Sequence, residues 1–252
     1  MDLIELPTSA GPAEAYVARP AESSGEEPHP GVLFFMDAIG LRPRIAGMAD
    51  RIASWGYVVL VPNVFHRDGS VAQLAPKGDL RAGEEREAFM SGAMTRVRAL
   101  TVELAVPDLA DYLAALRRLP GVPERPVAAV GYCMGARLAL RAAALDDGVA
   151  AVGCFHGGGL VTDAPDSPHL GLDQTRARFV FGHADGDRSM PPEAVAALGD
   201  ALEHAGLDAV NEVYEGAAHG YTMADTSAYD EAATERHFAM LRRLLVDTLP
   251  PA

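Results

Sequence analysis

Short apolar runs of strand length, bounded by glycine or proline, recur along the chain. Within most of them the apolar residues are continuous, with no polar residue at alternate positions. Continuous runs are typical of strands that are buried on both faces of a parallel sheet. The runs are GVLFFM (31–36), YVVLVP (57–62), VAAVG (127–131), VAAVGCF (149–155) and FVFG (179–182), and AVNEVY (209–214) is a further strand. The pattern therefore predicts a sheet of several buried strands.

The segments between these runs repeat apolar residues every three or four positions, which is the spacing of an amphipathic helix. Helices are expected over 43–55, 104–119, 133–145, 192–204 and 229–249. Strands that alternate with helices predict an α/β fold with a mostly parallel central sheet and helices on both faces. The first twenty residues differ, because two short apolar runs flank Thr8–Pro12, and they predict an antiparallel hairpin at the sheet edge.

Two irregular segments interrupt this alternation. Residues 21–30 are polar and are expected to form a loop, since too little apolar sequence precedes them to build a separate domain. Residues 68–92 form the longest irregular segment, and loops of that length usually serve function, so we expect it to lie over a pocket. A length of 252 residues without visible repeats indicates one domain, 1–252.

Composition narrows the possible partners. The chain carries 21 basic and 35 acidic residues, a net charge of −14, which disfavours binding to nucleic acid. Its two cysteines cannot build a disulfide framework, and no apolar run reaches the roughly 18 residues that span a bilayer. The amino terminus also lacks the basic region of a signal peptide. We therefore expect a cytoplasmic protein, a monomer or weak homodimer, that binds a small molecule and no membrane.

The most informative motif is Gly131-Tyr132-Cys133-Met134-Gly135, which follows a strand and opens a helix. Glycines two positions before and after a nucleophile, at a strand-to-helix turn, are the signature of a nucleophile elbow. A helix that begins at Cys133 directs free N–H groups and a positive dipole end toward its sulfur, and the N–H of Met134 can bind an oxyanion. Cys133 is therefore the candidate nucleophile, whereas the alternative is a buried structural cysteine, which is our interpretation of Cys154.

A nucleophile of this kind needs a base and an acid that orients the base, and both follow later strands. His219 follows the strand at 209–214, and Asp185 and Asp187 follow the strand at 179–182. We expect Asp185 to be the acid because it lies closer to the strand end, with Asp187 as the competing choice. The predicted catalytic set is therefore Cys133, Asp185 and His219.

Other conspicuous residues have simpler interpretations. His183, Asp185 and Asp187 resemble a metal cluster, but alternation along the chain would direct them apart, so we expect no metal and no cofactor. The glycines after His156 lack the ending of a phosphate-binding loop, and a turn is expected there. His156 and Tyr132 lie close in sequence to strand ends near the nucleophile and are candidates for contact with the substrate.

The sequence resembles the dienelactone hydrolase family, a Cys-His-Asp branch of the α/β-hydrolase fold, over essentially its whole length. GYCMG at 131–135, GHAD at 182–185 and EGAAHG at 215–220 match the nucleophile, acid and base motifs of that family. A fourth motif matches Met36–Gly40. The resemblance implies that Asp37 contacts the resting thiol and keeps it neutral, and that the N–H of Ala38 completes the oxyanion hole.

The family also has an arginine shortly after the base, which binds the carboxylate of the substrate. Here Tyr221-Thr222-Met223-Ala224 follows His219 without an arginine. Cations that can take its place are Arg42, Arg44, Arg81 and Arg86. The alternative is that these arginines pair with neighbouring acids at the surface.

The resemblance implies a hydrolase that cleaves a carboxylic ester or lactone of the dienelactone type through a thioester on Cys133. Two alternatives stay open. One is a general carboxylesterase that acts on neutral esters, and the other is a binding protein without catalytic activity on the same scaffold.

Overall fold

The computed structural model describes residues 2–21, 28–81, 83–124 and 126–251, and its centre is an eight-stranded sheet. The strands lie side by side in the order β1-β2-β4-β3-β5-β6-β7-β8. Their bounds are β1 (Asp2–Thr8), β2 (Gly11–Ala18), β3 (Gly31–Phe35), β4 (Val58–Pro62), β5 (Val127–Tyr132), β6 (Val149–Phe155), β7 (Arg178–Ala184) and β8 (Ala209–Tyr214). The predicted strands are confirmed to within two residues at most of their ends.

The sheet is parallel except at one edge. β1 and β2 pair antiparallel in a hairpin, and β2 pairs antiparallel with β4. Every pair from β4 to β8 is parallel. The predicted edge hairpin is therefore confirmed, and the carboxyl ends of β3, β5, β6, β7 and β8 open on the same side of the sheet, where α/β sheets build their sites.

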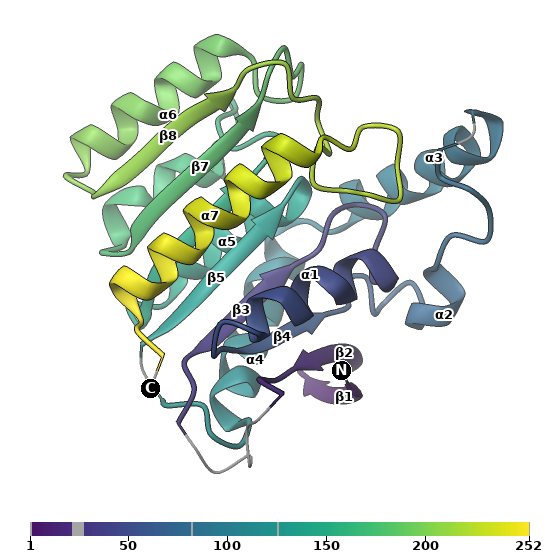
Figure 1. Ribbon diagram of the computed structural model, residues 1–252, viewed down its shortest axis with the longest axis horizontal. Helices are drawn as coiled ribbons and strands as arrows, with labels where there is room; N and C mark the ends of the chain where they lie inside the picture. Colours follow the sequence, from purple (N-terminus) through teal and green to yellow (C-terminus); the bar gives the residue numbers. More distant parts are fainter. Residues whose placement is uncertain (1, 22–27, 82, 125, 252) are drawn as a thin grey trace.

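Helices cover both faces of the sheet, as predicted (Figure 1). On one face α1 (Pro43–Ala53) contacts β2 and β4, and α7 (Glu231–Thr248) contacts β6 and β7. On the other face α4 (Val102–Arg118) packs beside α5 (Met134–Leu145). The short helix η1 (Pro168–Gln174) contacts both α5 and α6 (Pro192–His204) and so continues that layer.

The continuous apolar runs of the sequence are explained by the helices that pack on both faces of the sheet. Every residue of β3, β4 and β5 is buried, so each of their side chains packs on a helix layer or on the core. β8 differs because it is an edge strand, and only Tyr214 at its end is fully buried. The middle strands are therefore the most deeply buried, and the candidate nucleophile follows one of them, β5.

The segment 68–92 is not an irregular loop as predicted, since it holds α2 (Val71–Leu74) and the first half of α3 (Gly83–Ala99). A capping box between Ser70 and Gln73 starts α2. Within α3 only Ala93 and Val97 are buried, so the helix has no apolar stripe that sequence periodicity could detect.

Of the polar segment 21–30, residues 22–27 lie outside the described residues. Within the described ranges no helix is both long enough and apolar enough to cross a membrane.

Candidate active site

Cys133 occupies a strained turn between β5 and α5. Its backbone has φ 55° and ψ −119°, a conformation that residues other than glycine rarely adopt. A Cβ atom on Gly131 would lie 2.2 Å from the carbonyl oxygen of Gly135, and one on Gly135 would lie 2.5 Å from that of Met36. Both glycines are therefore required by close backbone approach, and the turn presents Cys133 at the carboxyl end of the sheet.

His219 lies against the thiol. Its Nε2 is 3.1 Å from Sγ of Cys133, and its Nδ1 is 2.6 Å from Oδ2 of Asp187. The three residues follow β5, β8 and β7, whose parallel carboxyl ends bring distant parts of the chain to the same edge. The arrangement places a thiol, an imidazole and a carboxylate in contact, which resembles the geometry of acyl-transfer sites.

The prediction of Asp185 as the acid that contacts His219 is wrong, because the contact is made by Asp187. Asp185 is exposed, and its carboxylate accepts a hydrogen bond from the backbone N–H of Gly216 at 2.9 Å. Gly186 has φ 61°, so the chain reverses after Asp185 and returns the side chain of Asp187 to the sheet edge. Proximity to the strand end was therefore a poor guide, since a left-handed glycine sits between the two acids.

The protonation of His219 and Asp187 is strongly coupled. Burial by itself lowers the pKa of His219, but the hydrogen bonds and negative charges of Asp187 and Cys133 outweigh burial and raise this pKa to about 10. Burial raises the pKa of Asp187, yet hydrogen bonds from His219 and Ser189 hold it at about 2. Asp187 is therefore ionised at neutral pH and stabilises a proton on His219.

A cavity of about 670 Å³ lies over these residues. Of the site residues expected from the sequence, the cavity is lined by Asp37, Ala38, Arg86, Cys133, Met134, His156 and His219. The side chains of Met90, Met94 and Val97, all from α3, form an apolar wall. The prediction that the segment 68–92 lies over a pocket is thus confirmed in part, through α3, and the wall suits the hydrocarbon part of a small molecule.

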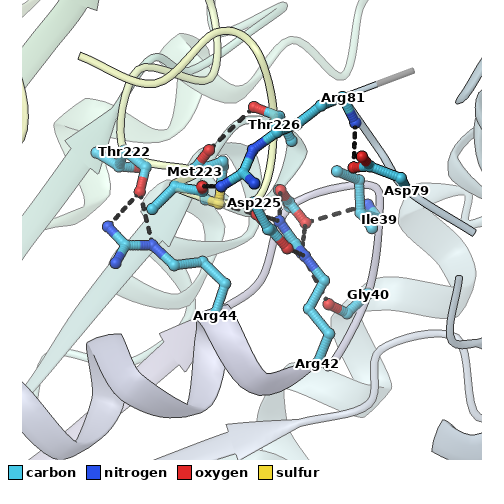
Figure 2. A network of polar contacts seen from close by, with 12 residues as sticks. Ile39, Gly40, Arg42, Arg44, Asp79, Arg81, Thr222, Met223, Asp225 and Thr226 are labelled. Atoms are coloured by element: carbon cyan, nitrogen blue, oxygen red, sulfur yellow. Dashed lines mark hydrogen bonds and ion pairs between the residues drawn. The ribbon is translucent and has the colours of Figure 1, made fainter. Parts of the chain in front are cut away.

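Arg42 is directed away from any substrate. Its side chain is 2% exposed and forms an ion pair with Asp37 at 2.7 Å. A second ion pair joins it to Asp225 at 2.5 Å (Figure 2). The hydrogen bonds of the Asp37 carboxylate within the described chain come from Arg42 and from the backbone N–H of Ile39. The expectations that Arg42 binds substrate and that Asp37 contacts the resting thiol are therefore not met, because each side chain is the other's partner.

Two further arginines hold the loop that follows His219 (Figure 2). Arg44 donates two hydrogen bonds to the carbonyl oxygen of Thr222, at 2.9 and 2.5 Å, and Arg81 donates one to that of Ala224 at 2.6 Å. Neither lines the cavity over Cys133. The expectation that Arg81 binds substrate is corrected accordingly, and Arg86 is the one of the four expected cations that reaches this cavity.

Tyr132 is also misplaced as a substrate contact. It is fully buried beneath the elbow, and its hydroxyl is 3.1 Å from Nε2 of His237. The reason is the alternation of side chains along a strand, which turns Tyr132 into the core when its neighbour Cys133 faces the cavity. Tyr132 therefore supports the turn from below.

His156 does line the cavity, as expected. Its Nε2 is 2.8 Å from Oγ1 of Thr222, and its ring lies edge-on to that of His219 with centroids 5.4 Å apart. Burial and the proximity of His219 lower the pKa of His156 well below its ordinary value, so it stays neutral at physiological pH. This neutral ring packs beside His219 and connects the end of β6 to the loop that follows His219.

Sequence reasoning missed Arg137, which lines the cavity one helical turn after Cys133. Burial lowers the pKa of Arg137, and a thiolate at Cys133 would oppose this shift. Within the described residues its guanidinium forms no ion pair. The usable signal was spacing, because residues four apart on a helix share a face. Two more cations, Arg98 and Arg188, line the same cavity.

The residues that resembled a metal cluster diverge. Nε2 of His183 is 2.7 Å from Oδ1 of Asn211, whereas Asp185 is exposed and Asp187 faces His219. Among the described residues there is no group of three or more histidine, cysteine or acidic side chains placed to hold a metal ion.

The mostly parallel sheet and the strained Cys133 turn beside His219 together define the α/β-hydrolase fold. The dienelactone hydrolase family model matches residues 13–248, so the chain belongs to that family and is a carboxylic ester hydrolase. The chain is similar to "Carboxymethylenebutenolidase 1" of Cupriavidus pinatubonensis, with 27% identity over 90% of this chain and 88% of that protein.

Solved structures agree on the fold. The crystal structure of a "Putative Dienelactone Hydrolase" from Klebsiella pneumoniae superimposes on this chain with a TM-score of 0.83 at 19% identity. The superposition covers 97% of this chain and 97% of that one. A dienelactone hydrolase from Anabaena variabilis gives a TM-score of 0.68 at 17% identity over 98% of this chain and 97% of that one.

Proposed function

We propose that this enzyme hydrolyses a small carboxylic ester or lactone through a thioester on Cys133, with His219 as base and Asp187 as the orienting acid. The observation that carries the proposal is the pair of contacts made by His219, 3.1 Å to Sγ of Cys133 and 2.6 Å to Asp187. Both lie at the wall of the cavity, where a carbonyl group can reach the sulfur. A binding protein would have no need of this chain of contacts.

In the first half of the reaction, the proton of Cys133 is held on Nε2 of His219, whose pKa is about 10, and the sulfur attacks the carbonyl carbon. The carbonyl oxygen becomes an oxyanion, and the backbone N–H groups of Ala38 and Met134 are the candidate donors to it. The intermediate then collapses, the bond from carbon to the alkoxy oxygen breaks, and His219 returns its proton to that oxygen. The products are a thioester and an alcohol.

In the second half, His219 takes a proton from water and the hydroxide attacks the thioester carbon. The carbon–sulfur bond breaks, His219 protonates the sulfur, and a carboxylic acid leaves. In a lactone the acid and the alcohol belong to one molecule, so the product is a hydroxy acid. Asp187 stays ionised throughout and stabilises the imidazolium form of His219.

The cavity supports a substrate with a hydrocarbon body. An anionic group on such a substrate would be bound by Arg137 or Arg86, since both line the cavity. A neutral ester is the alternative, supported by the internal hydrogen bonds that occupy Arg42, Arg44 and Arg81. Because the proposed nucleophile is a thiol, we place the enzyme in a reducing compartment, the cytoplasm, as a monomer or weak homodimer.

The test is turnover of p-nitrophenyl acetate by the parent protein, by Cys133→Ala and by the matched control Cys154→Ala. Cys154 is buried in the core and is not among the described residues that line the cavity, so it is a suitable control. We expect Cys133→Ala to be inactive and Cys154→Ala to retain activity. A mass increase of one acetyl group on the Cys133 peptide after rapid quenching would support the thioester, and equal rates for the parent and Cys133→Ala would refute the proposal.

A further inference from the structure

Three arginines hold the loop Thr222–Asp225, but Arg42 does so differently from the other two (Figure 2). Arg44 and Arg81 donate to backbone carbonyl oxygens of the loop. Arg42 instead forms ion pairs with two carboxylates, Asp37 on one side and Asp225 on the other. Because the Arg42 side chain is buried, removing either carboxylate would leave part of its charge uncompensated, and an uncompensated buried charge is destabilising.

The contact with Asp37 is bidentate. The two terminal nitrogens of Arg42 lie 2.7 and 2.9 Å from the two carboxylate oxygens, and one of them also donates to the carbonyl oxygen of Gly40 at 3.0 Å. Nε is 2.5 Å from Asp225. A planar fork of N–H groups can make these contacts together, whereas the ammonium group of a lysine cannot.

This clamp lies directly beside the oxyanion donor. Oδ1 of Asp37 also accepts a hydrogen bond from the N–H of Ile39 at 3.1 Å, so the backbone of Ala38 is held on both sides. The same segment touches the elbow, because Gly135 lies so close to the carbonyl oxygen of Met36 that no Cβ fits between them. The position of the Ala38 backbone at the wall of the cavity therefore depends on the clamp.

The clamp also decides where the Asp37 carboxylate points. Asp37 and Cys133 line the same cavity, so a released carboxylate would face the thiol. With Arg42 in place, the carboxylate oxygens are directed to the guanidinium, and the thiol is in contact with His219.

We propose that Arg42 is a positioning residue that fixes the N–H of Ala38 and withholds Asp37 from Cys133, so that Cys133 and His219 are paired before any substrate arrives. The catalytic half of this inference rests on the proposed function. The half that concerns the resting thiol does not, because it can be measured without an ester.

The experiment uses the full chain and two readouts, the rate of Cys133 alkylation by iodoacetamide without substrate, and kcat and KM for p-nitrophenyl acetate. Peptide mass mapping separates Cys133 from the buried Cys154. Arg42→Gln should slow the alkylation of Cys133 at least about fivefold, since the freed Asp37 takes a hydrogen bond from the thiol. It should also lower kcat roughly 10- to 100-fold with KM within about threefold, because an oxyanion donor acts in the transition state.

The double variant Arg42→Gln with Asp37→Asn separates the two effects and leaves no uncompensated charge at Asp37. Alkylation should return to within about twofold of the parent rate, since no carboxylate remains to capture the thiol. Because the clamp on Ala38 is still missing, kcat should stay at least about tenfold low. If Arg42→Gln fails to fold, the kcat of the double variant is the measurement that tests the inference.

The matched control is Arg44→Gln, which removes a guanidinium that anchors the same loop without touching Asp37. Both of its readouts should stay within about threefold of the parent. Parent-like alkylation in Arg42→Gln, or parent-like kcat in the double variant, would overturn the inference. If the parent hydrolyses no ester, or if Cys133→Ala stays active, the proposed function is refuted. The alkylation rates of Cys133 then still test whether Arg42 keeps the Asp37 carboxylate away from the thiol.

Discussion

Replacing Asp187 with asparagine removes the charge that faces His219 while the side-chain volume stays nearly constant. In the parent, Oδ2 of Asp187 accepts from Nδ1 of His219 at 2.6 Å, and this contact contributes to the raised pKa of about 10. An amide in the same place can turn its NH₂ group toward Nδ1. That moves the ring proton to Nε2, so His219 can no longer accept the proton of the Cys133 thiol.

The expected loss follows from two contributions. A hydrogen bond that involves a charged group contributes about 1.5–3 kcal/mol, which corresponds to roughly a 10- to 150-fold change in rate. A base held in the wrong tautomer loses more, since the same substitution in a Ser-His-Asp triad lowers kcat about 10⁴-fold. We therefore expect kcat for Asp187→Asn to fall between roughly 10²- and 10⁴-fold, with KM for a neutral ester within about threefold.

Steady-state hydrolysis of p-nitrophenyl butyrate between pH 6 and 10 measures this loss, and Asp185→Asn is the matched control. Asp185 is exposed and accepts only the N–H of Gly216 among the described contacts of its side chain, so its variant should retain activity within about threefold. A larger loss in Asp185→Asn than in Asp187→Asn would show that the acid has been assigned to the wrong residue.

Three further outcomes are expected. Arg137→Gln should raise KM for the anionic mono-p-nitrophenyl glutarate about tenfold and leave KM for p-nitrophenyl butyrate unchanged, and equal changes would argue against a carboxylate site. The pKa of His219 is raised from 6.5 to about 10, so its contribution to stability is complete below pH 6.5 and is lost as the pH rises toward 10. Urea unfolding should accordingly show a larger deficit for His219→Gln at pH 6 than at pH 10, and the opposite trend would contradict this sign. Gly135→Ala should destabilise the fold by about 3 kcal/mol, since its Cβ would meet the backbone oxygen of Met36 at 2.5 Å, whereas Gly47→Ala, with no atom within 4 Å, should be neutral or slightly stabilising in thermal unfolding.

The pairing of the two catalytic candidates was predictable because their motifs are local. Gly131, Cys133 and Gly135 encode a tight turn within five residues, and each glycine is needed for close backbone approach. His219 follows a strand, and parallel strands deliver their following loops to the same edge of a sheet. The acid was predicted less well, because the choice between Asp185 and Asp187 depends on the left-handed conformation of Gly186.

The arginines show the limit of sequence reasoning most clearly. Apart from the four-residue spacing between Cys133 and Arg137, the linear order does not distinguish Arg42, which is buried between two acids, from Arg137, which lines the cavity. One of those acids, Asp225, is 183 residues from Arg42 in sequence, so the ion pair exists only after the sheet has brought α1 and the His219 loop together.

Short-range patterns of side chains were enough to predict the alternation of buried strands and helices, the sharp turn at Cys133 and the order of the candidate reactive groups along the chain. The folded structure was needed to show which acid contacts His219, which arginines line the cavity, and that α3 forms the cavity wall. Those properties depend on contacts between distant segments, where burial and competition among charges choose one partner from several that the sequence offers equally.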